Sequence, residues 1–171
     1  MKTLRRDAFR NATLPPSVFF VPTDDFLVQL MERGAGRRII DAGAGTGRLS
    51  RQLREAGYVQ VAAIDIIRRS HSETEVERVD AVSFPYRPGD LVVLARPCHG
   101  EWIEKTVRAA TDAGAEVICI GRPSRIHDDF SADALEGAKL LDGPLGADDE
   151  VAFLFDAPIP DFRLSNGNVR F

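Results

Sequence analysis

Cysteine is scarce in this sequence, which has two, Cys98 and Cys119, in separate apolar-flanked segments. Two cysteines so placed give no sign of a disulfide framework, and the N-terminal residues carry positive charge without the apolar core of a secretion signal. No apolar run approaches the length of about 20 residues that crosses a bilayer. We therefore expect a cytoplasmic protein with reduced thiols and no membrane partner.

An excess of positive charge is also missing, since 22 Lys and Arg stand against 26 Asp and Glu and the net charge is −4. The net charge therefore provides no global attraction to nucleic acid or to an anionic membrane. Basic residues gather in 1–22, whereas 128–150 carries eight acidic residues. We interpret the first segment as a mobile N-terminal extension and the second as a solvated acidic face. The length suits one domain with a real core, so we expect residues 1–171 to form a single domain.

What is present is a regular alternation of apolar runs and amphipathic segments. The apolar runs are short, β-branched and continuous, which is typical of strands buried on both faces of a sheet. They cover residues 37–43, 59–66, 90–95 and 115–121, with a weaker strand at 75–82. Helical spacing and capping residues predict helices at 24–33, 47–57 and 101–114. This alternation predicts a doubly wound α/β fold with a mostly parallel sheet and helices on both faces.

The last quarter of the chain has a different pattern. Residues 131–141 are predicted to form one more helix. Residues 150–158 and 162–171 look like two strands, which we expect to join the sheet edge as a C-terminal antiparallel hairpin. In a doubly wound fold, ligands bind beyond the carboxyl ends of the parallel strands. Candidate functional residues should therefore lie in the loops that follow those ends.

The segment IIDAGAGTGRLS is the most informative of these loops. A buried strand runs into Asp41, and Gly43, Gly45 and Gly47 follow before a helix begins. Glycines there permit positive φ and let the backbone approach a ligand, while the helix N-terminus presents free N–H groups to it. The spacing differs from the G-x-G-x-x-G pattern of dinucleotide sites, because Arg48 stands where the third glycine would be. The loop is therefore built to hold a ligand against bare backbone.

The DAGAGTG segment resembles motif I of the class I S-adenosylmethionine-dependent methyltransferases. Two later acidic residues extend the resemblance: Asp65 matches the residue that holds the ribose hydroxyls in that family, and Asp80, with Ala81 beside it, matches the residue near the adenine. The resemblance implies that S-adenosylmethionine is the cofactor. It implies that the cofactor is bound by Asp41, Gly43, Gly45, Gly47, Asp65, Asp80 and Ala81. A nicotinamide cofactor is the alternative that a glycine loop in this fold leaves open.

By the same resemblance, the methyl acceptor binds beside the loop after the fourth strand, which here reads Arg96-Pro97-Cys98-His99. Enzymes that methylate amino groups of DNA bases carry Asn/Asp-Pro-Pro-Tyr/Phe there, and this sequence keeps only the first proline. The Pro-Cys pair is similar instead to that of cytosine-C5 methyltransferases, whose DNA enzymes use the thiolate as nucleophile. Arg96, Cys98 and His99 are therefore the candidate catalytic residues; the alternative for Cys98 is a partly buried spectator thiol. For Trp102 the alternatives are packing against the core, which we expect, and contact with the cofactor or a flat substrate.

Two arginines, Arg96 and Arg122, directly follow predicted strands. If these strands are neighbours in register, both guanidinium groups stand at one rim of the acceptor site and would bind an anionic acceptor there. The alternative pairs the arginines with acidic residues such as Glu101, Asp128 or Asp129.

The sequence thus predicts an S-adenosylmethionine-dependent methyltransferase, with an anionic acceptor as one hypothesis. The alternative is a non-catalytic cofactor-binding or protein-interaction module with the same fold, because the residues after the fourth strand depart from known acceptor motifs. Small molecules and macromolecules, nucleic acid included, stay open as acceptors. Residues 82–90 leave no room for a full helix, so a second copy in a homodimer or the N-terminal segment would cover that side of the cofactor. The histidines and cysteines lack paired ligand spacing, and no metal site is expected.

Overall fold

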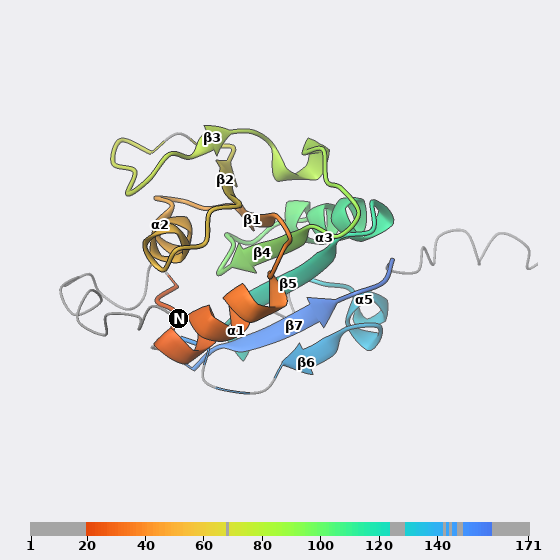
Figure 1. Ribbon diagram of the computed structural model, residues 1–171. Coiled ribbons are helices and arrows are strands. Elements are labelled where there is room, and N and C mark those ends of the chain that lie inside the picture. The colour runs from red at the N-terminus through yellow and green to blue at the C-terminus, as the bar shows by residue number, and fades with distance from the viewer. Residues whose placement is uncertain are drawn as a thin grey trace, which may run out of the picture.

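The computed structural model describes residues 20–67, 69–123, 129–141, 143, 145–146 and 149–158. The strands within them are β1 (Ile39–Ala42), β2 (Val61–Asp65), β3 (Glu77–Arg78), β4 (Leu91–Ala95), β5 (Glu116–Gly121), β6 (Lys139–Leu141) and β7 (Val151–Phe155). They form one sheet in the order β3-β2-β1-β4-β5-β7-β6 (Figure 1). The first five strands run parallel, and β7 is antiparallel to both β5 and β6. The predicted doubly wound fold with an antiparallel hairpin at one edge is therefore confirmed.

The helices alternate with the parallel strands as predicted. They are α1 (Asp24–Arg33), α2 (Arg48–Glu55), α3 (Trp102–Asp112), α5 (Ala132–Glu136) and the short 3₁₀ helix η2 (Ala81–Ser83). The bounds of α1 match the predicted ones because its start is capped: Thr23 Oγ1 accepts a hydrogen bond of 3.1 Å from the amide of Phe26. Two acidic residues in its first turn interact favourably with the helix dipole. Among the described residues, no helix is long and apolar enough to span a membrane.

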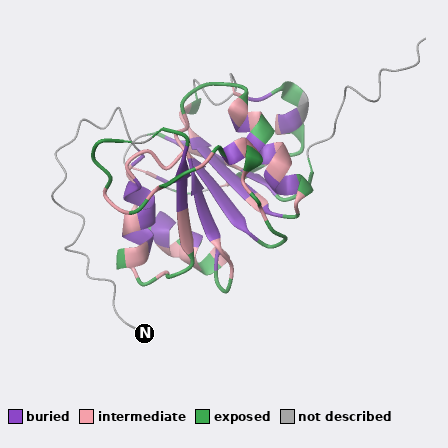
Figure 2. Ribbon diagram, turned by 90° about the horizontal axis from the view of Figure 1, so that it is seen from above, coloured by how far each residue is buried: buried purple, intermediate pink, exposed green. Residues whose placement is uncertain are grey.

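The core consists of two apolar clusters, one on each face of the sheet. Consecutive residues of a strand point to opposite faces, so Ile39 belongs to one cluster and Ile40 to the other. One cluster contains buried side chains of α1 and α2, and the other contains those of α3 and the η2 and α5 segments. The central strands are buried along most of their length, as Figure 2 shows. This burial on both faces explains why their sequences are continuous apolar runs.

The predicted helix over 131–141 is wrong in its second half. The helix α5 ends at Glu136, Gly137 follows it, and residues 139–141 form β6. Glycine is a poor helix former, and pairing with β7 satisfies the backbone groups of β6 that a helix would otherwise have satisfied. The hairpin therefore joins β6 to β7, which lies within the predicted strand 150–158. The other predicted strand, 162–171, lies outside the described residues.

The chain packs against the sheet from Phe20 onward. The Phe20 side chain is buried, and its ring meets the Phe26 ring edge to face with centroids 5.6 Å apart. Pro22 forms a β-bridge with Gly146, and the amide of Thr23 donates to the carbonyl of Leu145 at 3.0 Å. These contacts attach the segment before α1 to the loop between β6 and β7. Residues 1–19, which make up most of the predicted extension, lie outside the described residues.

Candidate functional site

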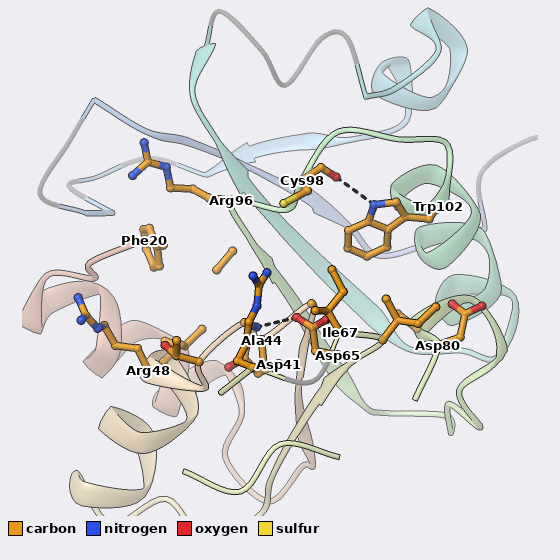
Figure 3. A pocket seen from close by; sticks show the side chains of 18 of the residues that line it. Phe20, Asp41, Ala44, Arg48, Asp65, Ile67, Asp80, Arg96, Cys98 and Trp102 are labelled. Atoms are coloured by element: carbon orange, nitrogen blue, oxygen red, sulfur yellow. Dashed lines mark hydrogen bonds between the residues drawn. The ribbon is translucent and has the colours of Figure 1, made fainter. Parts of the chain in front are cut away.

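A cavity of about 720 Å³ lies at the carboxyl ends of β1, β2 and β4 (Figure 3). This volume falls within the range of about 300–1,000 Å³ that is typical of small-molecule sites. Eight of the predicted site residues line it: Asp41, Gly43, Gly45, Asp65, Asp80, Ala81, Arg96 and Cys98. The other three, Gly47, His99 and Arg122, are absent from the described lining. The fold thus brings most of the predicted site together.

The glycine loop connects β1 to α2 through three residues with positive φ, Gly43 at 69°, Gly45 at 59° and Gly47 at 80°. Side chains rarely adopt this conformation, which accounts for the glycines. A Cβ on Gly43 would lie only 2.9 Å from Cη2 of Trp102. The indole of Trp102 therefore packs directly on the start of the loop, and it also lines the cavity. Trp102 therefore packs as expected, and its place in the cavity lining agrees with the alternative that the sequence left open.

Gly47 has a different role from its two neighbours. A Cβ there would lie 2.7 Å from Cγ2 of Thr74 and 2.9 Å from Cγ2 of Val76. The space beside Gly47 is filled by the segment between β2 and β3 and not by the cavity. The role of Gly47 in cofactor binding stays a prediction. Its glycine is explained by the positive φ and by this packing.

Asp41 lines the cavity from the end of β1 and is 2% exposed. Its Oδ2 accepts hydrogen bonds from the hydroxyl of Ser50 at 2.7 Å and from the amide of Ser50 at 3.2 Å. Burial raises the pKa of Asp41 to about 6, because desolvation disfavours the charged form, and the hydrogen bonds from Ser50 oppose the shift. The carboxyl group thereby joins β1 to the first turn of α2.

Asp65 ends β2, lines the cavity and contacts the glycine loop directly. Its Oδ2 accepts a hydrogen bond of 2.8 Å from the amide of Gly45, and its Oδ1 accepts one of 2.7 Å from the amide of Ile67. A carboxylate has about four lone-pair positions, so two amide donors leave acceptor capacity on Asp65 for ligand hydroxyls. Ile66 and Ile67 follow it on the cavity wall and are 59% and 53% exposed. A ligand with an apolar surface would cover the Ile66 and Ile67 side chains.

Asp80 and Ala81 lie on the cavity wall after β3. Asp80 caps η2, because its Oδ1 accepts a hydrogen bond of 3.0 Å from the amide of Val82. Ala81 is buried, whereas Asp80 is exposed at the mouth. The single 3₁₀ turn here agrees with the prediction that no full helix fits between the third and fourth strands.

The loop after β4 begins with Arg96, the non-glycine residue with positive φ, 51°, in the described chain. Such backbone strain is concentrated at functional sites. The Arg96 side chain is 10% exposed and its Nη1 lies 3.6 Å from Oε1 of Glu150, a partner that the sequence did not indicate. Cys98 is exposed in the cavity wall, and its carbonyl accepts a hydrogen bond of 2.9 Å from Nε1 of Trp102. This bond connects the loop to the start of α3.

His99 and Arg122 do not meet Arg96 in the cavity wall. His99 Nδ1 lies 2.7 Å from Oδ1 of Asp129, so that carboxylate pairs with the histidine, and Glu150 is a partner of Arg96. β4 and β5 are parallel neighbours as predicted, with Ala95 opposite Ile120, yet the half-buried Arg122 lies off the lining. The described part of the chain contains no group of three or more His, Cys, Asp or Glu placed to hold a metal ion.

Some lining residues escaped the sequence-based prediction. Phe20 precedes α1 by several residues and carries no local sign that it reaches the carboxyl ends of the strands. Arg48 was noted only as the residue that replaces a third glycine, although it begins α2 and lines the cavity. Ile66 and Ile67 could have been found, because two apolar residues directly after an acidic strand end are unusual in an exposed loop.

A scan of the sequence against protein-family models gives no match, and a search of the curated proteins gives none. Solved structures are more informative. The fold is similar to that of the ribosomal protein L11 methylase from Lactobacillus delbrueckii subsp. bulgaricus, at 13% identity and a TM-score of 0.50 over 77% of each chain. It is also similar to the TrmN protein of Thermus thermophilus, at 18% identity and a TM-score of 0.50 over 77% of this chain and 47% of that one.

A third similar structure contains ligands. It is the 1,6-didemethyltoxoflavin-N1-methyltransferase of Burkholderia thailandensis, with bound 1,6-didemethyltoxoflavin and S-adenosylhomocysteine. The identity is 13% and the TM-score 0.51, over 77% of this chain and 76% of that one. At these identities the similarity concerns the fold: the chain has the class I methyltransferase fold.

Proposed function

We propose that this protein is an S-adenosylmethionine-dependent methyltransferase, which binds its cofactor in the cavity beyond β1, β2 and β4. The observation that carries the proposal is the convergence of three segments, far apart in sequence, on one cavity: the glycine loop, Asp65 and the Asp80–Ala81 turn. The cavity has the volume of a small-molecule site. The Burkholderia enzyme, which has S-adenosylhomocysteine bound, lends support because it shares the fold.

The residues that line the cavity fit the parts of this cofactor. The Asp65 carboxylate is held by two amides and has acceptor capacity for the two ribose hydroxyls. The exposed side chains of Ile66 and Ile67 offer an apolar surface to the adenine. Asp41, as an anion near neutral pH, would lie near the cationic amino-acid part of the cofactor.

When bound, S-adenosylmethionine supplies an electrophilic methyl carbon on a sulfonium. Transfer of this methyl group to a lone pair of the acceptor would leave S-adenosylhomocysteine as the second product. The task of the protein is to hold the acceptor in line and exclude water, which can lower the barrier by about 7–11 kcal/mol. A base is needed only if the acceptor must lose a proton. The loop that begins with Arg96 forms a wall of the cavity on the acceptor side.

Arg96 favours an acceptor that carries negative charge. It lines the cavity on the acceptor side, and the guanidinium group binds carboxylates and phosphates through paired N–H groups. Arg122 was proposed from the sequence as the second arginine of the site. Because Arg122 lies off the described lining, a different residue would act together with Arg96 at the acceptor.

Calorimetric titration tests the cofactor. We expect S-adenosylmethionine and S-adenosylhomocysteine to bind and NAD not to bind. Replacing Asp65 by Ala should weaken binding about tenfold or more, because hydrogen bonds to a charged group contribute roughly 1.5–3 kcal/mol. Replacing Asp112, an exposed acid at the end of α3, by Ala serves as the control and should change nothing. Binding of NAD in preference to the other two would refute the proposal, and binding without methyl transfer to any acceptor would favour the non-catalytic module.

The variant Cys98→Ser separates in-line transfer from covalent catalysis. Cys98 is exposed in the cavity wall, so a nucleophilic thiol has access to an acceptor. In-line transfer needs no thiol, and we expect the variant to keep its methyl-transfer rate within a few-fold. Complete loss of transfer with normal cofactor affinity would instead identify Cys98 as the nucleophile.

A further inference from the structure

Charged residues of both signs line the cavity. Its acidic residues are Asp41 in β1, Asp65 at the end of β2 and Asp80 after β3. Arg48 and Arg96 lie with Phe20 on the opposite side, away from Asp80 and Trp102 (Figure 3). If the cofactor occupies the side of Asp65 and Asp80, the side with the two arginines is left for the acceptor.

Both arginines are held in place by buried or half-buried carboxylates. Arg48 is 8% exposed and its Nε lies 3.0 Å from Oε1 of Glu73, while Arg96 lies beside Glu150. A guanidinium group has five N–H donors, and a single carboxylate does not accept hydrogen bonds from all of them. Such contacts therefore orient the group and are compatible with a further ligand. Arg69 and Lys105 also line the cavity, but from exposed positions where solvent weakens their attraction for an anion.

The wall on this side includes apolar residues. Phe20 and Leu49 belong to one apolar cluster, Ala95 packs against it, and all three line the cavity. The Phe20 ring is fixed edge to face against Phe26, with an interplanar angle of 88°. Gly146 lies close behind, since a Cβ there would be 2.8 Å from Cε2 of Phe20. This side therefore combines a flat apolar surface with two oriented cations.

We infer that the methyl acceptor is a small monocarboxylate with a ring-sized apolar body, which contacts Phe20 while its carboxylate lies between Arg48 and Arg96. The inference rests on the proposed function, because the methyl group must come from the cofactor. A monoanion fits better than a doubly charged phosphate because Arg48 already contacts Glu73 and Arg96 contacts Glu150, and these carboxylates repel a doubly charged ligand more strongly. The apolar wall accounts for the ring.

Benzoate is the first probe, with benzamide as its neutral counterpart and inorganic phosphate as the competing anion. Trp102 is the single tryptophan of the sequence and lines the cavity, so its fluorescence reports on ligand binding. Each probe is titrated at constant ionic strength, with and without S-adenosylhomocysteine. We expect benzoate to bind about tenfold or more tightly than benzamide, because hydrogen bonds to a charged group exceed neutral ones. Phosphate should bind more weakly than benzoate.

Matched variants locate the anion. Arg96→Gln and Arg48→Gln should each weaken benzoate binding about tenfold while leaving the affinity for S-adenosylhomocysteine unchanged. Arg51→Gln is the control, because Arg51 binds the same carboxylate as Arg48, Glu73, but does not line the cavity among the described residues. If Arg96→Gln does not fold because Glu150 is then left without its cation, the double variant Arg96→Gln/Glu150→Gln makes the same test.

Equal affinity for benzoate and benzamide would overturn the inference, as would tighter binding of phosphate or unaltered benzoate binding in both arginine variants. Failure of the wild-type protein to bind S-adenosylhomocysteine would count against the proposed function instead. The titration of benzoate without that ligand still tests the arginine site in that case. The two failures are therefore distinguishable.

Discussion

Asp41 illustrates how burial changes a single residue. The unfolded chain releases its proton near pH 3.8, whereas the buried carboxyl group has a pKa of about 6. Between these values the folded state binds more protons than the unfolded chain. The stability from this group is therefore fully present below about pH 4 and is lost as the pH rises through about 6. A shift of about 2 units corresponds to roughly 3 kcal/mol, at about 1.4 kcal/mol per unit.

Replacing Asp41 by Asn should remove this pH dependence. Urea unfolding at about pH 4 and about pH 7 gives the free energy of unfolding of both proteins. We expect the wild-type value minus the variant value to fall by up to roughly 3 kcal/mol between the two pH values. An exposed acid replaced in the same way, Asp112→Asn, should follow the wild type. Parallel pH profiles for wild type and Asp41→Asn would contradict the raised pKa.

Gly43 is a residue where backbone conformation and close contact act together. Alanine there must adopt a φ of 69° and its Cβ must come within 2.9 Å of Trp102. Gly36 has a similar φ of 74° with nothing within 4 Å of its Cβ position, so Gly36→Ala measures the backbone cost alone. That cost is about 1–2 kcal/mol, and Gly43→Ala should lose about 1–3 kcal/mol more in urea unfolding. A shift of tryptophan emission in Gly43→Ala only should accompany the loss; equal destabilisation of both variants would argue against the contact.

At the scale of elements, the segment between β2 and β3 is attached to α2 through Glu73. The amide of Glu73 donates to the carbonyl of Thr46 at 2.7 Å. Its carboxylate accepts hydrogen bonds from Thr46 Oγ1 at 3.2 Å, Arg48 Nε at 3.0 Å and Arg51 Nε at 3.0 Å. Because Arg48 lines the cavity, this attachment also sets one side of the site.

Replacing Glu73 by Gln should loosen that segment. The amide keeps one acceptor oxygen but loses the charge, so we expect a loss of about 1–3 kcal/mol and faster hydrogen exchange in residues 69–78. The exposed Glu55 also pairs with Arg51, at 3.2 Å, and Glu55→Gln should cost less than about 0.5 kcal/mol. Unchanged exchange in Glu73→Gln would mean that packing of Thr74 and Val76 on Gly47 holds the segment by itself.

For the whole molecule, the two apolar clusters share the central strands. Ile39 and Ile40 of β1, like Val92 and Val93 of β4, contribute to opposite faces of the sheet. Unfolding of the central strands would therefore expose both clusters. We therefore propose that the chain is one cooperative domain.

A single thermal transition is the expected result. Circular dichroism and Trp102 fluorescence should give the same midpoint, and the calorimetric enthalpy should equal the van't Hoff enthalpy. S-adenosylhomocysteine at about 100 times its dissociation constant should stabilise the protein by about 2.7 kcal/mol, if it binds only the folded state. Two resolved transitions would show that the clusters unfold separately.

Several features of the fold and site could be predicted because they are local. The continuous apolar runs indicated strands buried on both faces, and Thr23 with two acids after it marked the start of α1. The spacing of Asp41, Gly43, Gly45 and Asp65 predicted that these residues lie together at the strand ends, and all four line the cavity. These signals lie within a few residues or one strand–helix–strand unit.

Other features depended on contacts between distant segments. β6 is too short and too exposed to show a strand pattern, and it is a strand because β7 pairs with it. Phe20 and Arg48 reach the cavity, Arg96 faces Glu150, and Gly47 makes room for Thr74, through packing that no local pattern encodes. The sequence by itself determined the parallel sheet and the glycine loop, because periodicity and backbone conformation are properties of short segments. Only the tertiary structure decided which charges face one another across the cavity, because a side chain's partner is set by how segments far apart in the chain pack together.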